Sequence, residues 1–221
     1  MTRGKSAGRS NDGRAARFLR RAWYAALQQA ARVALVAFGG IRVYHRERLP
    51  AAGGVLVIAN HQSYLDPVLA AVGMPRPFEP MARESLFRFP PFAWLIRSLY
   101  AFPVKRGTAD LGAIKEALRR LKAGGVVLMF PEGTRTQDGS IGPLHAGPIA
   151  IATRAGVPIV PLVIDGAFES WPRMRLLPRP QKIRVAVGEP VVPPRGADAD
   201  AVMAEVRSRM VALQAELRRK H

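Results

Sequence analysis

The stretch that decides the fold reads Gly54-Val55-Leu56-Val57-Ile58-Ala59 and continues as Asn60-His61-Gln62-Ser63-Tyr64-Leu65-Asp66-Pro67. Its first half is a short, continuous apolar run, which is typical of a strand buried within a sheet. The residues that follow, Pro67-Val68-Leu69-Ala70-Ala71-Val72, have the character of a helix start. A histidine therefore stands at the carboxyl end of a predicted strand and an aspartate at the mouth of the next helix. In open α/β sheets, ligands bind at this place.

The pair formed by His61 and Asp66 has two interpretations. A neutral imidazole held by a carboxylate is suited to removing a proton from an alcohol near neutral pH. The alternative is structural, because Asp66-Pro67 also fits a helix N-cap followed by proline at the first helical position. A single histidine, equally, is commonly a loop or core residue. The catalytic interpretation therefore depends on a second motif.

Charged residues follow two further predicted strands. The apolar run Val126-Val127-Leu128-Met129-Phe130 leads into Phe130-Pro131-Glu132-Gly133-Thr134-Arg135, and Phe102-Pro103-Val104 leads into Lys105-Arg106-Gly107. Together the three strand ends supply a base, a carboxylate to orient it, a glutamate and three cations. That combination suits the deprotonation of an acceptor that carries a phosphate.

At these blocks the sequence resembles the glycerophospholipid acyltransferases, most closely the bacterial 1-acylglycerol-3-phosphate acyltransferases. The resemblance covers about residues 40–190, most of the chain. The matching segments are Asn60 to Asp66, Val104-Lys105-Arg106, Phe130 to Arg135 and Val157-Pro158-Ile159-Val160-Pro161-Leu162. The resemblance implies that His61 is the general base and that Asp66 orients it. It implies that the acceptor is bound at Lys105, Arg106, Glu132, Gly133, Thr134 and Arg135.

The resemblance also implies a reaction. An acyl group would pass from acyl-ACP or acyl-CoA, as co-substrate, to the free hydroxyl of a lysophospholipid, and 1-acylglycerol 3-phosphate would yield phosphatidic acid. No cofactor, no metal and no covalent enzyme intermediate are expected. One departure leaves the headgroup open: many members carry a basic residue where Leu144-His145-Ala146-Gly147 has histidine. An acyltransferase for another lysolipid or polar headgroup is therefore the alternative.

The amino-acid composition limits the classes of molecule that this protein is expected to bind. The 221 residues include 34 Lys and Arg against 16 Asp and Glu, which gives a net charge of +18 and no cysteine. Such a charge attracts anionic phospholipid, nucleic acid or an acidic carrier protein. The absence of cysteine excludes disulfides and thiol nucleophiles. We expect a membrane surface with anionic phospholipid, a carrier-protein or coenzyme A thioester and a lysophospholipid as partners, with no nucleic acid.

The N-terminal region divides into two predicted parts. Residues 1–16 are polar and basic and are predicted to form a disordered arm. Residues 17–41 show basic and apolar residues at helical spacing and predict an amphipathic segment at the membrane interface, on the cytoplasmic face. A helix packed on the following domain is the alternative. Two other segments have two interpretations each. The aromatic stretch 85–100 forms either part of the core or a contact with lipid, and the basic, proline-rich loop 170–180 is either a solvated loop or a contact with lipid or carrier.

Residues 42–221 are predicted to form the acyltransferase domain. Its strands and helices alternate, which predicts an α/β fold with a largely parallel central sheet flanked by helices and with the amphipathic helix as an N-terminal appendage. The expected strands cover 54–59, 78–83, 126–130, 159–164 and 182–187, and the expected helices cover 67–72, 110–122, 147–156 and 198–220.

Two other classes of function remain to be weighed. A serine hydrolase would use Ser63 or Ser140, but a nucleophile elbow needs glycine two residues before and after the serine. His61 and Asp138 occupy the preceding positions. A non-enzymatic basic binder of membrane or nucleic acid would explain the net charge, but not the charged clusters at the strand ends.

Overall fold

The computed structural model describes residues 6–105, 110–194 and 196–220. Within this part of the chain, seven strands form one sheet in the order β1-β7-β6-β2-β5-β3-β4. Every strand pair is parallel except β6 with β7. The strands are β1 (Ile41–Tyr44), β2 (Val55–Ala59), β3 (Phe78–Arg83), β4 (Phe102–Val104), β5 (Val126–Met129), β6 (Ile159–Asp165) and β7 (Ile183–Val187). The predicted α/β fold with a largely parallel sheet is confirmed.

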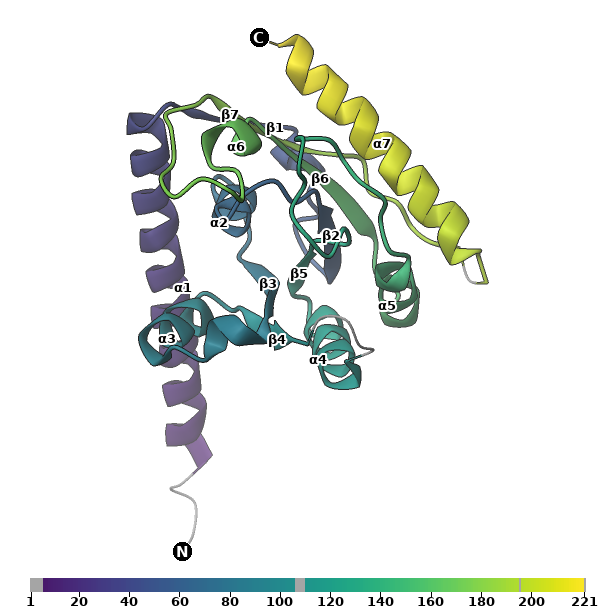
Figure 1. The fold of residues 1–221 in the computed structure, drawn as a ribbon. Coiled ribbons are helices and arrows are strands. Elements are labelled where there is room, and N and C mark those ends of the chain that lie inside the picture. Colours follow the sequence, from purple (N-terminus) through teal and green to yellow (C-terminus); the bar gives the residue numbers. More distant parts are fainter. Residues whose placement is uncertain (1–5, 106–109, 195, 221) are drawn as a thin grey trace, which may run out of the picture.

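Helices cover both faces of the sheet (Figure 1). On one face α4, α5 and α7 pack on β2, β5 and β6, and on the other α1 and α2 pack on β1 and β6. The helices are α1 (Ser6–Ala37), α2 (Asp66–Ala71), α3 (Pro90–Ser98), α4 (Leu111–Lys122), α5 (Gly147–Ala155), α6 (Ala167–Ser170) and α7 (Ala199–Arg219), with the 3-10 turns η1 (Arg46–Arg48) and η2 (Glu84–Phe87).

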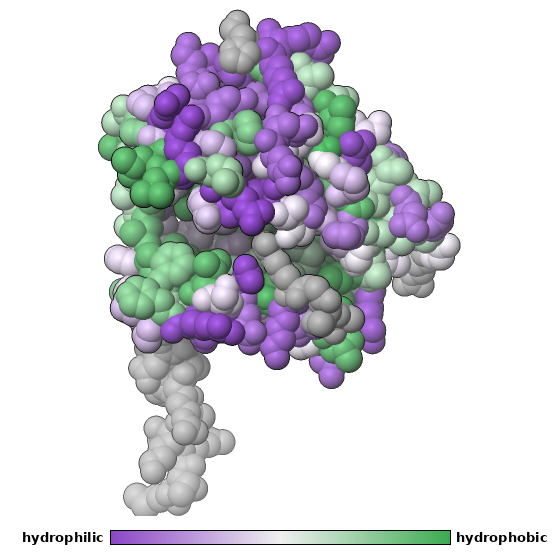
Figure 2. All heavy atoms as spheres, in the orientation of Figure 1, coloured by the Kyte–Doolittle hydropathy of each residue, from purple (hydrophilic) through white to green (hydrophobic). Residues whose placement is uncertain are grey.

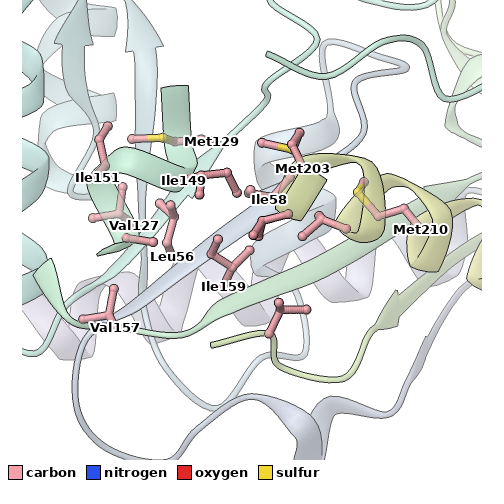
Figure 3. Packing of buried hydrophobic residues seen from close by; sticks show 14 of the residues in the cluster. Leu56, Ile58, Val127, Met129, Ile149, Ile151, Val157, Ile159, Met203 and Met210 are labelled. Carbon is pink, nitrogen blue, oxygen red and sulfur yellow. The ribbon is translucent and has the colours of Figure 1, made fainter. Parts of the chain in front are cut away.

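The core forms two layers because side chains along a strand alternate between its faces. In β2, Leu56 and Ile58 point into the layer under α4, α5 and α7, which Figure 3 shows, whereas Val55 and Val57 point into the layer under α1 and α2. Each of these side chains is fully buried. Burial on both faces explains why β2 is continuously apolar rather than alternating.

Helix α1 begins at Ser6, so its range overlaps the arm predicted over residues 1–16. Helix propagation adds a hydrogen bond for each residue fixed, so a stable helix further along extends readily into a stretch containing alanine and arginine. Residues 1–5 lie outside the described part of the chain. The helix ends at Ala37, before Gly39-Gly40 as the sequence suggests. No helix in the described ranges has the length and apolar character needed to cross a bilayer.

One face of α1 packs on the domain. The Gln28 amide donates to the carbonyls of Ala71 and Met74 at 2.7 and 3.1 Å. The buried Tyr24 hydroxyl accepts a hydrogen bond from the Phe78 backbone, and burial raises its pKa to about 12. Other apolar side chains of α1 are exposed: Phe18, Leu19, Trp23, Val33 and Val36. The predicted alternative of a helix packed on the domain therefore holds for one face of α1, and apolar side chains are exposed elsewhere on the helix.

Candidate active site

The motif from Asn60 to Asp66 and the motif from Phe130 to Arg135 meet because the strands that precede them are neighbours in the sheet. β2 and β5 pair in parallel, with Ile58 opposite Met129. The residues that follow each strand therefore emerge at the same edge of the sheet. His61 and Glu132 lie in these two adjacent segments, and the site is assembled between them.

The loop from His61 to Asp66 closes around one carboxylate oxygen. Asp66 Oδ2 lies 2.7 Å from His61 Nδ1 and accepts hydrogen bonds from the backbone N–H groups of Gln62 at 2.6 Å and Ser63 at 2.8 Å. Asp66 is fully buried. Burial raises its pKa, and the hydrogen bonds from His61, Ser63 and Gln62 oppose that effect. The carboxylate thus fixes both the loop and the imidazole.

The geometry tests the N-cap interpretation of Asp66. The N-cap of α2 is Leu65, Asp66 is the first helical residue, and no side-chain cap is formed. The Asp66 carboxylate instead bonds to groups that precede it in the chain, including the His61 ring. The Asp66 side chain therefore does not cap α2, and it contacts the His61 ring instead.

Contacts from the segment around Phe130 to Thr136 also position His61. Its ring stacks on Phe130 with centroids 4.4 Å apart, and its carbonyl accepts a hydrogen bond from the Thr136 N–H at 2.8 Å. The His61 side chain is 12% exposed. Because Nδ1 faces Asp66, the proton belongs on Nδ1 and the lone pair on Nε2, which leaves Nε2 to accept a proton.

Glu132 links the two loops through the backbone. Its Oε1 accepts a hydrogen bond from the His61 N–H at 3.0 Å, and a backbone hydrogen bond from Gly142 also reaches its carboxyl group. Burial raises the pKa of Glu132 to about 7, while these hydrogen bonds act in the opposite direction. Its observed contacts hold the loop that carries His61.

Arg135 lies flat on an aromatic ring of the same loop. Its guanidinium carbon is 3.4 Å from the centroid of the Tyr64 ring. The Nη1 atom is buried and has no hydrogen-bond partner within the described part of the chain. A guanidinium held by its face in this way keeps its N–H donors available for an anion.

The other predicted acceptor residues are more exposed. Gly133 adopts a left-handed conformation (φ 69°) in the turn after Phe130, and Thr134 follows it at the surface. A Cβ placed on Gly133 would lie 3.7 Å from Nε2 of His145. The histidine at the position where the family commonly has a basic residue therefore borders the turn that carries Gly133 and Thr134.

Lys105 lies further along the same edge. It follows the edge strand β4, which pairs in parallel with β3, itself the neighbour of β5. At about 4.8 Å per strand, Lys105 is two strand spacings, or about 10 Å, from the end of β5. Its side chain is exposed and its N–H donates to Asp110. Arg106 lies outside the described residues.

The motifs also contain site residues whose role the sequence does not indicate. Tyr64 and Phe130 form platforms for Arg135 and for the His61 ring. Asn60 is buried and exchanges two hydrogen bonds of 2.8 Å with the Ile164 backbone, which ties the end of β2 to β6. Aromatic residues directly beside a candidate base or cation are the signal that could have identified the first two.

The described residues give no support to a serine nucleophile. Ser63 is buried and its hydroxyl accepts from the Leu65 N–H, whereas the Ser140 hydroxyl donates to Asp138. Neither hydroxyl has a hydrogen bond to a histidine in the part of the chain that is described. Within the same part, no cluster of three or more His, Asp or Glu residues is arranged to hold a metal ion.

Comparison with known proteins identifies the family. The Acyltransferase family profile matches residues 40–165, more than half of the chain. The 1-acyl-sn-glycerol-3-phosphate acyltransferase of Bacillus subtilis is 32% identical over 163 residues, which are 73% of this chain and 79% of that protein. The chloroplastic LPAT1 of Arabidopsis thaliana is 28% identical over 184 residues, 81% of this chain, and the chain spans about half (51%) of its length.

A solved structure agrees with both the fold and the family. The crystal structure of the 1-acyl-sn-glycerophosphate (LPA) acyltransferase PlsC from Thermotoga maritima superimposes with a TM-score of 0.77 at 27% identity, covering 90% of this chain and 81% of that one. The sequence match, the shared fold and the His61–Asp66 pair at the strand ends lead to one conclusion. The chain belongs to the acyltransferase family.

Proposed function

We propose that this protein transfers an acyl group from a thioester to the free hydroxyl of 1-acylglycerol 3-phosphate, giving phosphatidic acid. The observation that carries the proposal is the 2.7 Å contact between His61 Nδ1 and the buried carboxylate of Asp66. This contact presents Nε2 as a base in the loop that also carries Tyr64, on which the Arg135 guanidinium lies. The relatives named above share the reaction in their names.

The reaction balances with these groups alone. The acceptor hydroxyl gives its proton to Nε2 of His61 while its oxygen attacks the thioester carbonyl carbon. The tetrahedral intermediate then collapses, the carbon–sulfur bond breaks, and the imidazolium returns the proton to the departing thiolate. The products are the ester and the free thiol. Asp66 stabilises the imidazolium and keeps the ring in one orientation.

The acceptor phosphate would be bound by cations along the edge of the sheet. Arg135 offers the paired N–H donors that match phosphate oxygens, and Tyr64 holds its plane. Lys105 and Arg106 would reach the same anion from the end of β4, and Gly133 and Thr134 would contact it from the exposed turn. Glu132 would act mainly by fixing the His61 backbone.

The acyl donor would be acyl-ACP or acyl-CoA. Both present a thioester on an anionic carrier, and the net charge of +18 favours either one. Since the acceptor is a lipid, the enzyme would work at a membrane surface on the cytoplasmic face. The exposed apolar side chains of α1 and the arginines of its first half fit an anionic leaflet.

The test is to supply the purified full chain with lysolipids that differ only in headgroup and with both donors, and to identify each product by mass. Phosphatidic acid formed from 1-acylglycerol 3-phosphate is the expected product. The histidine at position 145 makes a different headgroup the second candidate, because an imidazole is a weaker and pH-dependent cation. A preferred acceptor without a phosphate monoester would reject the proposal.

A further inference from the structure

The loop between α6 and β7 exposes apolar side chains at its tip. This α6–β7 loop covers residues 171–182. Met174 is 92% exposed, Leu176 91% and Leu177 73%, the highest values among large apolar side chains of the described residues. Soluble surfaces rarely expose a contiguous apolar group of this kind without a partner. The tip therefore needs an explanation.

The loop is held in one conformation by its own polar groups. Its ends close through two hydrogen bonds between Ser170 and Arg179, one from the Arg179 N–H to the Ser170 carbonyl at 2.8 Å and one from the Ser170 hydroxyl to the Arg179 carbonyl at 2.9 Å. The Trp171 indole donates to the carbonyl of Arg175 at 3.0 Å. These hydrogen bonds tie the base of the loop together, and Met174, Leu176 and Leu177 are exposed on it.

Cations surround the apolar tip. Between Trp171 and Lys182 the sequence holds no acidic residue, and its cations are Arg173, Arg175, Arg179 and Lys182. Long basic side chains can keep their charge at lipid headgroups while their stems follow apolar surface. An apolar tip with a basic rim matches the boundary between the headgroups and acyl chains of an anionic leaflet.

The loop also joins the active site to the end of α1. The Trp171 ring lies 5.7 Å from the Tyr64 ring, the platform of Arg135. At the other end, a Cβ placed on Gly39 would lie 2.6 Å from the Gln181 backbone, so the two segments are in close contact. Figure 2 shows apolar side chains gathered along the edge of the molecule where Figure 1 places α3 and the bend of this loop.

We propose that the α6–β7 loop inserts Met174, Leu176 and Leu177 into an anionic phospholipid leaflet. Through Trp171 and Tyr64, the insertion would set the Arg135 side of the active site against the surface that supplies the lysolipid. The purpose of the insertion rests on the proposed function, because only a lipid acceptor requires the site to meet a bilayer. The insertion itself is measured without any reaction.

The experiment compares full-length variants in binding to vesicles. One variant carries Met174→Ser, Leu176→Ser and Leu177→Ser together, and a matched control carries Leu111→Ser, Val192→Ser and Val211→Ser, which alter exposed apolar residues elsewhere. Vesicles of pure phosphatidylcholine and vesicles that include phosphatidylglycerol are used. We expect the loop variant to lose about tenfold or more of its partition into the anionic vesicles, since each apolar side chain of this size favours insertion by about tenfold when fully buried.

Activity measurements then distinguish insertion of the loop into a membrane from docking of a carrier protein on it. The loop variant should be slower with lysolipid embedded in vesicles and unchanged with a short-chain lysolipid dissolved as monomer. Wild-type partition in the loop variant overturns the inference. So does unchanged partition combined with a raised KM for an acyl carrier protein thioester, which would make the loop a docking site for the carrier. If the wild-type protein binds vesicles but acylates no lysolipid, the proposed function fails while the insertion stands or falls on the partition alone.

Discussion

Oε1 of Glu132 accepts a hydrogen bond from the backbone N–H of His61 at 3.0 Å. The glutamate of one strand-end loop thus fixes the main chain of the residue that carries the base in the other. Asp66 holds the ring of the same residue through Nδ1. Two carboxyl groups therefore determine where His61 Nε2 points, one through the backbone and one through the side chain.

Glu132→Gln should change the pH dependence of stability. Burial raises the Glu132 pKa from 4.5 to about 7, so between these values the native state binds a proton that the unfolded state has lost. The contribution of Glu132 to the free energy of unfolding is therefore fully present below pH 4.5, and it is lost as the pH rises through about 7. Ionisation of the Glu132 carboxyl group costs at most about 3.5 kcal/mol, at about 1.4 kcal/mol per pKa unit, and less after solvent screening.

The neutral glutamine cannot ionise, so Glu132→Gln should lose stability less steeply than wild type between pH 5 and pH 8. Denaturant unfolding at several pH values measures this slope. Glu205→Gln, on the exposed surface of α7, is the matched control and should follow the wild-type curve. Parallel curves for Glu132→Gln and wild type would mean that the carboxyl group is not protonated in the native state near pH 6.

His61→Ala should abolish most of the acyl transfer while the protein remains folded. The change removes the base from a partly exposed position, and general-base removal costs on the order of 10²- to 10⁴-fold in turnover. His45→Asn is the matched control, because asparagine tolerates the left-handed conformation of that residue (φ 57°). Near-wild-type turnover by a folded His61→Ala protein would contradict the mechanism.

Asp66→Asn should impair activity more than stability. The asparagine oxygen would take the place of Oδ2, which accepts from the Gln62 and Ser63 N–H groups and contacts His61 Nδ1, and the amide nitrogen would take the place of Oδ1, which has no hydrogen-bond partner among the described residues. This neutral oxygen still holds the ring, but it lacks the negative charge that stabilises the imidazolium formed when His61 takes the proton of the acceptor hydroxyl. We expect turnover to fall on the order of 10²-fold or more, with a smaller change in the denaturation midpoint. A large loss of stability with normal activity per folded molecule would assign Asp66 a purely structural role.

The strand-end motifs could be predicted because their geometry is local. A fully apolar run such as β2 indicates a buried strand, and the carboxyl ends of parallel strands share one edge of the sheet. The order of the strands could not be predicted, since it depends on long crossover connections. The edge strand β1 was missed because it is short and includes Arg42, which weakens a strand pattern.

Contacts that depend on the conformation of the loop backbone also could not be predicted from the sequence. Nothing in the motifs indicates that Glu132 bonds to the His61 main chain or that Arg135 lies on Tyr64. The aromatic stretch 85–100 illustrates a second limit. Composition cannot separate core from surface, and the structure leaves Phe89 and Trp94 each 65% exposed beside α1, whose Trp23 ring lies 6.2 Å from that of Trp94.

Substituting exposed apolar residues of α1 should weaken membrane binding without unfolding the domain. Phe18 and Leu19 are 71% and 65% exposed, whereas Tyr24 and Gln28 anchor the helix. Phe18→Ser with Leu19→Ser should therefore reduce partition into anionic vesicles by about tenfold or more. Vesicle co-sedimentation measures this, and Val192→Ser serves as the control. If the variant partitions into vesicles like wild type, Phe18 and Leu19 do not contribute to membrane binding.

Arg135 provides the most direct test of the acceptor. Its guanidinium rests on Tyr64 with a buried, unpaired Nη1. Arg135→Lys keeps the charge but loses the planar pair of donors, so the KM for a phosphate-bearing lysolipid should rise about tenfold or more, while the KM for the thioester should change little. Tyr64→Leu should have a smaller effect in the same direction, because it removes only the platform.

The discriminating measurement is a ratio of kcat/KM values, that for 1-acylglycerol 3-phosphate divided by that for a neutral monoacylglycerol. A contact made equally in the ground and transition states appears in KM, and one that strengthens in the transition state appears in kcat, so the ratio detects either. If Arg135 binds the phosphate, Arg135→Lys should erase most of the preference, because the neutral acceptor never used the contact. Arg154→Lys, at the exposed end of α5, should retain it. A wild-type ratio in the Arg135 variant would mean that this arginine only shapes the loop, and the acceptor phosphate would then have to be sought at the end of β4.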